Sequence, residues 1–423
     1  MQKTAAAIGL STIALFAGLA PESRMAAAGP SPSADRADIQ FGKLGSAIKL
    51  GAKVAARPKF TDEDEARMAQ AQGKKFDAAH QMWPDPLLET YLTGIVQKLV
   101  AVAKPRPFPY RVRVVNDASL NAFTVGGGLL YIHAGLVATV ENEAQLAMVL
   151  GHEIAHVTEG HVTSGIEHAY TTQLLGDVAV TAGGAAGIPV SGKTLELAYD
   201  ATMNAAINGH GRNQERDADR IGIDYMTKAG YDPREATITF ELLLAANGDQ
   251  PRLVNFFYGR HPANQERFDT LTALAKTKYA GDVSSKRLIV NTEDFKRATR
   301  TAVIATGRLD YEEGRFQGAK AMFDKAVRVW QDDPVPHFYL GKIALETGAA
   351  PDAIDTAIRE LEAAVMADEA YAPAHRDLGL AYYRKGDRAK AIASLEKYLV
   401  VDTDAKDAAQ IRTTVAELKR YGG

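Results

Sequence analysis

Residues 141–161 read ENEAQLAMVLGHEIAHVTEGH, and the fold can be worked out from this stretch. Its apolar residues recur every three or four positions, which predicts a long helix over about 141–175. His152 and His156 are four residues apart, so on a helix they project from the same face. Two imidazoles at this spacing can hold one metal ion, with Glu153 beside the ion, where it can accept a proton from water. The alternative is an ordinary helix with two surface histidines.

A second stretch, residues 214–219 (QERDAD), offers carboxylates at helical spacing. A catalytic metal needs a third protein ligand, and the chain has no cysteine, so we look for a histidine or a carboxylate. Glu215 and Asp219 are four residues apart and share one face of a predicted helix over about 212–229. One of them can bind the metal while the other hydrogen-bonds a metal-binding histidine. By itself this pattern also fits a solvated acidic face.

Three short segments between the helical stretches predict a small sheet. Residues 110–115 (YRVRVV) alternate polar and apolar side chains, as a half-buried strand does. Residues 122–125 and 129–133 predict two more strands, separated by three consecutive glycines. The strand near Asn121 is either an ordinary structural strand or an edge that pairs with an extended substrate.

From about residue 300 onward the chain contains three similar helix–turn–helix segments. Gly314 and Gly386 lie about two periods of ~34 residues apart, once an insertion of about four residues is allowed for. The clearest segment has Leu378-Gly379 followed by Ala391 and Leu395, small and large residues that suit two closely packed helices. These positions resemble the tetratricopeptide repeat, and the alternative is a plain helical bundle. Stacked repeats of this kind form a curved surface that binds peptides or proteins.

The whole-chain properties limit the class of protein. At 423 residues the chain is long enough for two or three domains. Its formal net charge of −3 comes from interspersed charges, so we expect no nucleic-acid partner. Residues 1–28 combine a short basic start, an apolar run and small residues, as a secretory signal peptide does, with cleavage expected after Ala20 or Ala28. The alternative is an uncleaved membrane anchor, although the run is shorter than a spanning helix needs.

These motifs together resemble the CAAX protease and HtpX-type family of HExxH gluzincin metallopeptidases. The likeness is greatest to its BepA-like periplasmic branch, which carries a tetratricopeptide repeat tail. The shared stretches are NAF at 121–123, GGGLLYIHAGL at 126–136, ENEAQLAMVLGHEIAHVTEGH at 141–161, ERDADRIGIDYMTKAGYDP at 215–233 and RHP at 260–262. One departure is Gly211-Arg212, which stands where the family usually has Ser-Arg.

The resemblance implies a mostly helical fold with a small β-sheet, an α+β zincin protease domain, followed by an α-solenoid of tetratricopeptide-type repeats. It implies one Zn²⁺ per chain with His152, His156 and Glu215 as metal ligands, Glu153 as the catalytic base and Asp219 as the carboxylate that supports a zinc histidine. We expect His261 to be either an inhibitory extra ligand or a group that stabilises the oxyanion. The expected divisions are a signal peptide (1–28), a flexible lead-in (29–57), the protease domain (58–280), a linker (281–300) and the repeats (301–423).

The function that the resemblance implies is a zinc-dependent endopeptidase of the periplasm. We expect it to hydrolyse peptide bonds of misfolded or misassembled periplasmic and outer-membrane proteins. The repeats would recruit protein substrates or the envelope assembly machinery, and peripheral association with the membrane is compatible with this role. The alternative is a tetratricopeptide chaperone or adaptor with a latent or inactive protease domain. A third hypothesis is a structural zinc site, whose closed shell of four ligands leaves no position for water.

Overall fold

The computed structural model describes residues 61–165, 167, 211–249, 265–285, 287–348 and 352–420. The expected signal peptide and lead-in lie outside these residues, and so does His261. All the described residues belong to one compact unit, Lys59–Gly423. None of the described helices combines the length and the apolar character needed to cross a membrane.

A three-stranded sheet lies at the centre of residues 61–285, a part of the chain that we call the sheet domain. Its strands are β1 (Arg111–Val115), β2 (Ala122–Thr124) and β3 (Leu129–His133), in the order β1-β3-β2. β1 runs parallel to β3, whereas β2 runs antiparallel to it. The three predicted strands are therefore confirmed, and β2 is an edge strand of the described sheet.

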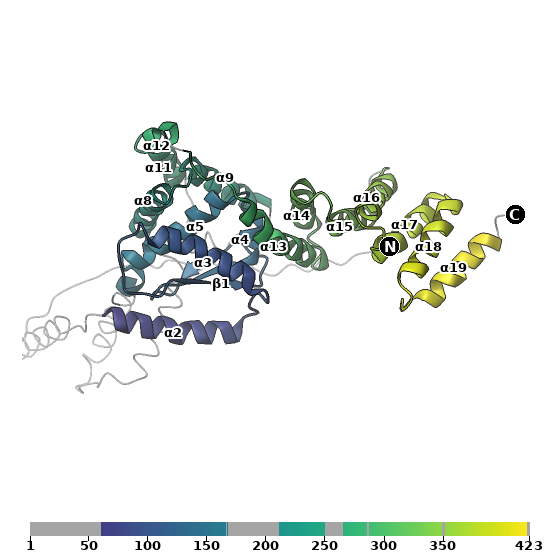
Figure 1. The fold of residues 1–423 in the computed structure, drawn as a ribbon, viewed down its shortest axis with the longest axis horizontal. Coiled ribbons are helices and arrows are strands. Elements are labelled where there is room, and N and C mark those ends of the chain that lie inside the picture. Colours follow the sequence, from purple (N-terminus) through teal and green to yellow (C-terminus); the bar gives the residue numbers. More distant parts are fainter. Residues whose placement is uncertain are drawn as a thin grey trace, which may run out of the picture. The chain divides into compact units, whose positions relative to one another are not determined.

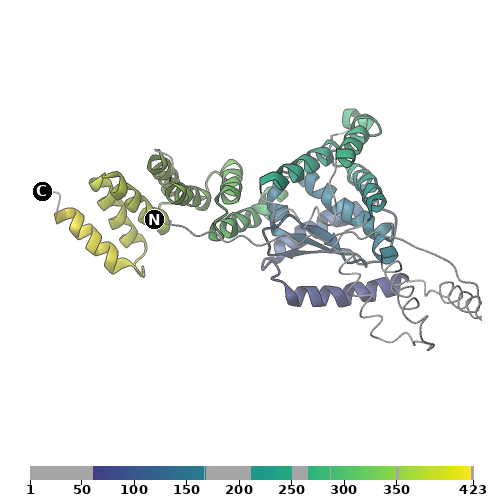
Figure 2. The same ribbon diagram turned by 180° about the vertical axis from the view of Figure 1, so that it is seen from behind.

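Helices cover both faces of this sheet (Figures 1 and 2). They are α2 (Asp62–Ala79) on one face, and α3 (Pro86–Val100) and α5 (Glu143–Thr158) on the other. Successive side chains of a strand point to opposite faces. Accordingly, Leu129 and Tyr131 of β3 pack with Phe76 of α2, while Leu130 and Ile132 join the core that contains α3 and α5.

Helix α5 is buried along its whole length, from Glu143 to Thr158. The remaining helices of the sheet domain are α4 (Ala134–Thr139), α8 (Arg212–Lys228), α9 (Arg234–Asp249), α11 (Gln265–Lys276) and α12 (Ala280–Ser285). The single helix that we predicted over 141–175 is interrupted, because α5 ends at Thr158 and Gly160 has a φ of +67°. This left-handed backbone turns the chain before the next helical residues begin.

The rest of the described chain is a series of helices. They are α13 (Glu293–Glu312), α14 (Phe316–Val329), α15 (Pro334–Thr347), α16 (Ala353–Ala367), α17 (Ala372–Lys385), α18 (Arg388–Val401) and α19 (Ala408–Arg420). Consecutive helices pack in pairs through one equivalent glycine in each pair: Gly307, Gly341 and Gly379. A Cβ atom there would lie 2.9, 2.7 and 2.6 Å from Phe323, Leu361 and Leu395 respectively. Large side chains thus fill the space that the glycines leave, as the predicted repeats require.

The first repeat packs against the sheet domain. The stretch 281–300, which we expected to be a linker, includes the start of α13, and its Phe295 is buried in the core of the sheet domain. From α14, the buried Lys325 Nζ donates hydrogen bonds to the carbonyl oxygens of Ala138 and Val140, at 2.6 Å each. The apolar face of α13 therefore begins upstream of residue 300.

Candidate metal centre

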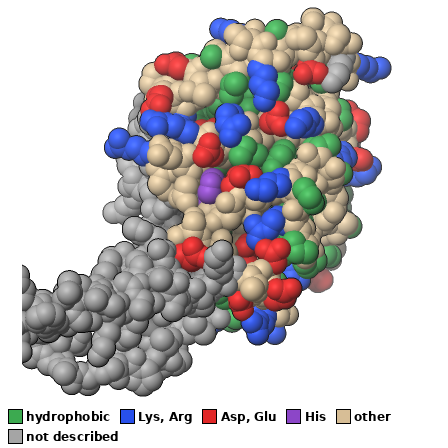
Figure 3. Space-filling model, turned by 90° about the vertical axis from the view of Figure 1, so that its left-hand side faces the viewer, with side chains coloured by type: hydrophobic (Ala, Val, Ile, Leu, Met, Phe, Trp, Pro, Cys, Tyr) green, Lys and Arg blue, Asp and Glu red, His purple; other side chains and the backbone are tan. Residues whose placement is uncertain are grey.

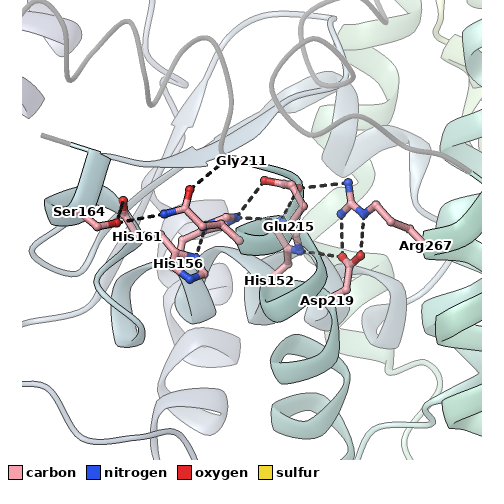
Figure 4. Close-up of polar contacts among 9 residues, drawn as sticks. His152, His156, His161, Ser164, Gly211, Glu215, Asp219 and Arg267 are labelled. Atoms are coloured by element: carbon pink, nitrogen blue, oxygen red, sulfur yellow. Dashed lines mark hydrogen bonds and ion pairs between the residues drawn. The ribbon is translucent and has the colours of Figure 1, made fainter. Parts of the chain in front are cut away.

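Three potential ligand atoms converge between α5 and α8 (Figure 4). The Nε2 atoms of His152 and His156 lie 3.1 Å apart. The Glu215 carboxylate lies 3.5 Å from each of these nitrogens, through Oε2 to His152 and Oε1 to His156. All three side chains are buried. Among the described residues, this is the group of three or more His and acidic side chains that can hold a metal ion.

The separations fit a small tetrahedral ion. Zinc binds imidazole nitrogen and carboxylate oxygen at about 2.0–2.2 Å, so two ligands at the tetrahedral angle lie roughly 3.3 Å apart. The three measured separations, 3.1, 3.5 and 3.5 Å, bracket this value. Two imidazoles and one carboxylate are also the donor set of a catalytic zinc site that keeps a position for water or substrate.

Two glycines explain how helices from distant parts of the sequence bring these ligands together. Gly151 and Gly222 lie where α5 crosses α8. A Cβ atom on Gly222 would lie 2.9 Å from the backbone nitrogen of His152, and one on Gly151 would lie 3.0 Å from the carbonyl oxygen of Gly222. The backbones therefore meet almost directly. This close approach places the first turn of α8, with Glu215, beside the histidines of α5.

Asp219 and Arg267 hold the far side of the His152 ring. The Nδ1 atom of His152 lies 3.0 Å from Asp219 Oδ1. Arg267, on α11, donates from Nε and Nη2 to the two oxygens of Asp219, at 2.6 and 2.7 Å, and its Nη1 lies 3.1 Å from Glu215 Oε2. Because its other nitrogen is held in this way, His152 presents Nε2 to the metal position.

The same carboxylates control the protonation of these groups. Burial alone would lower the pKa of His152, but the hydrogen bonds and negative charges of Asp219 and Glu215 raise it to about 10. Burial alone would raise the pKa of Asp219, but the Arg267 guanidinium and His152 lower it. Asp219 is therefore held as a charged acceptor for the His152 ring.

His156 has an outer partner of a different kind. Its Nδ1 lies 3.0 Å from Nδ1 of His161, which is buried, with 7% of its surface exposed. The sequence pattern does not indicate this contact, because His161 would point away from the metal position if α5 continued past Thr158. The turn at Gly160 redirects the chain and brings the His161 ring back to His156.

Glu153 is buried next to a small cavity. The cavity has a volume of about 20 Å³ and its described lining includes His152, Glu153, Met148, Val149, Thr239, Phe240, Leu243 and Arg267. This volume holds about one water molecule. A carboxylate, a metal-binding histidine and apolar walls thus surround a space of the size of a nucleophilic water.

The structure places four of the expected site residues in direct contact: His152, His156, Glu215 and Asp219. Glu153 adjoins them on α5, and His261 lies outside the described residues. The sequence analysis missed Arg267 and His161. Arg267 lies 48 residues beyond Asp219, and no local pattern connects them. For His161 the available signal was Gly160, a residue that commonly ends a helix.

The surface shows no concentration of one charge on the face drawn in Figure 3. Basic and acidic side chains of the described residues are interspersed there, with apolar side chains between them. This distribution agrees with the small net charge of −3.

Comparison with known proteins gives a family match to the sheet domain. The sequence model of "Peptidase family M48" matches residues 86–275. The beta-barrel assembly-enhancing protease of Yersinia pestis is 32% identical over 200 residues, covering 46% of this chain and 39% of that protein. The protein of the same name from Escherichia coli (strain K12) is 28% identical over 250 residues, covering 57% and 47%. The chain thus spans less than half the length of these two relatives.

A third relative is shorter. The metalloprotease LoiP of Escherichia coli (strain K12) is 30% identical over 177 residues, covering 42% of this chain and 66% of that protein. All the proposed metal ligands fall inside the matched range of the family, and so do the outer residues Asp219, Arg267 and His161. Residues 86–275 of this chain belong to peptidase family M48.

Proposed function

We propose that the chain is a zinc-dependent endopeptidase of the cell envelope. The observation that carries the proposal is the convergence of His152, His156 and Glu215 at separations that suit one tetrahedral zinc ion. The M48 match covers all three residues and supports the same reading. We propose one zinc ion per chain, held by the ligand group that these three described residues form.

The proposed chemistry assigns a separate task to each side chain. A bound zinc ion supplies Lewis acidity, which acidifies water and polarises a carbonyl group. Glu153, beside the cavity that has room for about one water, would accept the proton of the attacking water and then deliver it to the leaving amine. Asp219 keeps His152 in the orientation that ligand binding requires.

An extended polypeptide is the substrate class that we propose. β2 pairs with β3 along one side only within the described sheet, and it packs against α5, the helix with the two histidines. The other side of an edge strand can pair with an extended chain through main-chain hydrogen bonds. Misfolded or misassembled envelope proteins offer such segments, and the repeats would recruit them or an assembly machine.

The location in the periplasm is part of the same proposal. Two relatives are named as beta-barrel assembly-enhancing proteases, and β-barrel proteins are assembled in the outer membrane. Residues 1–28 have the pattern of a signal peptide. N-terminal sequencing of the protein recovered from the periplasm should give a start after Ala20 or Ala28. A chain that keeps Met1 and stays with the membrane would contradict cleavage.

The central test compares proteolysis by the zinc-loaded wild type and Glu153→Gln, with casein as the substrate. Because the amide cannot take the proton, we expect Glu153→Gln to bind zinc normally and to lose activity by about 10²- to 10⁴-fold. Equal activity in the two proteins would remove the assignment as an enzyme and leave a repeat-containing adaptor.

His261 requires its own variant in this assay. If this histidine holds the enzyme in check as an extra ligand, His261→Ala raises casein cleavage above that of the wild type. If it stabilises the oxyanion, the same variant loses activity while its zinc content stays unchanged. Combining His261→Ala with Glu153→Gln provides the control, because any activity gained must disappear in the double variant.

A further inference from the structure

We propose that His161 is a positioning residue of the metal centre, whose Nδ1 accepts a hydrogen bond from Nδ1 of His156. The inference rests on the proposed function only in that it takes the centre to bind zinc. The two nitrogen atoms lie 3.0 Å apart, and both rings are buried. Their rings meet edge to face, with centroids 5.0 Å apart.

The direction of this hydrogen bond follows from the ligand geometry. His156 turns Nε2 toward His152 and Glu215, so Nε2 must have a free lone pair when a metal is bound. The ring proton of a neutral His156 then resides on Nδ1, and this atom is the donor. Nδ1 of His161 must therefore accept, which it can do only as the neutral tautomer that keeps its proton on Nε2.

The backbone around His161 is tied to the helix that carries the third ligand (Figure 4). Ser164 Oγ donates to the carbonyl oxygen of His161 at 2.9 Å. Gln214 Nε2 donates to Ser164 Oγ at 3.0 Å, and Gln214 Oε1 accepts from the backbone nitrogen of Gly211 at 3.0 Å. Because Glu215 directly follows Gln214, this chain of bonds fixes His161 relative to both helices of the centre.

The two zinc histidines are thus supported differently. His152 is held by a charged carboxylate, itself paired with Arg267, whereas His156 is held by a neutral imidazole. Without an acceptor on His161, the buried Nδ1 donor of His156 would lose this hydrogen bond, which orients the ring. Outer partners of metal-binding histidines typically change metal affinity by about 10- to 100-fold when they are removed.

The test measures the zinc dissociation constant of the full chain by competition with a chromophoric chelator. In His161→Asn the side-chain oxygen takes the place of Nδ1, so we expect an affinity close to that of the wild type. His161→Phe keeps the ring volume without an acceptor, and His161→Gln moves the acceptor one bond further from the backbone. Both should weaken zinc binding by about 10- to 100-fold.

A matched control is available in the repeats. His375 is buried to a similar extent, with 6% exposed, and its Nε2 contacts the carbonyl oxygen of Glu369 at 2.9 Å. His375→Phe should leave zinc affinity unchanged. Circular dichroism and melting of the metal-free proteins verify folding, and if His161→Phe does not fold, His161→Gln decides the test.

Two results would overturn the inference. Zinc binding as tight as the wild type in both His161→Phe and His161→Gln would show that His156 needs no such partner. An equal loss in His161→Asn and His161→Gln would show that the acceptor position is irrelevant. Absence of casein cleavage by zinc-loaded wild type would instead contradict the proposed function and leave the comparison of affinities intact.

Discussion

The charges around the metal centre sum to a negative value. Glu153, Glu215 and Asp219 are carboxylates, Arg267 is a guanidinium, and all four are buried. Their formal charges, three negative and one positive, add to −2 when all four are ionised and His152 is neutral, the form in which it can bind a metal. Burial of ionised groups is costly unless opposite charges balance them. A divalent cation supplies the balancing charge, so metal binding and folding of this region should be linked.

Arg267→Met should therefore destabilise the metal-free protein. The substitution leaves Asp219 and Glu215 without the guanidinium that contacts both, and breaking a buried ion pair typically costs about 3–5 kcal/mol. Zinc should reduce this loss because it restores a positive charge. Arg267→Lys keeps the charge but not the forked geometry, so its stability should lie between that of the wild type and that of Arg267→Met.

Tryptophan fluorescence can measure this loss of stability in the sheet domain. The chain has two tryptophans, and Trp83 is buried in the core of the sheet domain. Denaturant unfolding of a Trp330→Phe background therefore reports on that core through Trp83. The proposed charge balance would be contradicted if Arg267→Met and the parent protein gave the same unfolding curves both with and without zinc.

A further buried carboxylate, Glu143, is predicted to make stability depend on pH. It accepts hydrogen bonds from Tyr91 at 2.8 Å and Tyr231 at 2.7 Å, and also from Thr292. Burial would raise the pKa of Glu143, but these donors and Lys98 lower it below its usual 4.5. A lowered pKa means that Glu143 stabilises the fold above pH 4.5, and that this contribution is lost as the pH falls through the folded value.

Glu143→Gln should consequently be less stable than the wild type at neutral pH, by about 1–3 kcal/mol, since it breaks a buried hydrogen-bond network. The difference should shrink below pH 4.5, as the wild type loses its ionised carboxylate. The measurement is urea unfolding of both proteins at a series of pH values between about 3 and 7. Glu63→Gln, an exposed change on α2, is the control, and a constant difference at every pH would contradict the prediction.

At the level of elements, the crossing of α5 and α8 determines the geometry of the centre. Gly222→Ala should separate the helices, because its Cβ would lie 2.9 Å from the backbone nitrogen of His152, which cannot move aside as a flexible side chain can. We expect weaker zinc binding and lower stability, by about 1–3 kcal/mol as for other overpacked sites.

Gly94→Ala is the matched control for that change. Gly94 lies in the middle of α3, and a Cβ atom there meets nothing within 4 Å. This variant should gain about 0.5–1 kcal/mol from helix propensity and keep its zinc affinity. Zinc titration and thermal unfolding of both variants make the comparison, and normal zinc affinity in Gly222→Ala would show that the helices have room to adjust.

Local patterns explain how much of this arrangement could be predicted. The spacing of His152 and His156, and of Glu215 and Asp219, is a property of single helices, so the sequence was enough to select them. The His161 contact depends on where α5 ends, and a single left-handed glycine decides that. The parallel pairing of β1 with β3 and the Arg267 contacts are long-range, and no short sequence pattern specifies them.

On the scale of the whole molecule, the first repeat helix completes the sheet domain. Thr292 caps α13 and also donates a hydrogen bond to Glu143 at the start of α5. Phe295 and Ala302 of α13 belong to the same core as α5. The position of the boundary between the two domains, which we placed at a linker over 281–300, stays a prediction, and these contacts favour a boundary after α13.

Two truncations test the position of that boundary. A chain that ends at Glu312 keeps α13, and we expect it to fold and to bind zinc. A chain that ends at Asn291 lacks Thr292 and Phe295, leaves Glu143 without one donor and opens the core, so it should bind zinc poorly. Zinc titration with circular dichroism distinguishes them, and equal competence of both chains would restore the boundary before α13.

The order in which the residues of the metal centre occur along the chain has a consequence for biosynthesis. Its side chains come from residues 152–161, then 215–219, and finally Arg267 of α11. A polypeptide emerges from its N-terminus onward, so the early histidines are made well before the guanidinium that balances the acidic pair. A nascent chain cannot hold these side chains in their final geometry until this last helix has docked. Metal loading should therefore be a late step of maturation. Under the proposed function, a chain that has not finished folding would not yet cleave other proteins.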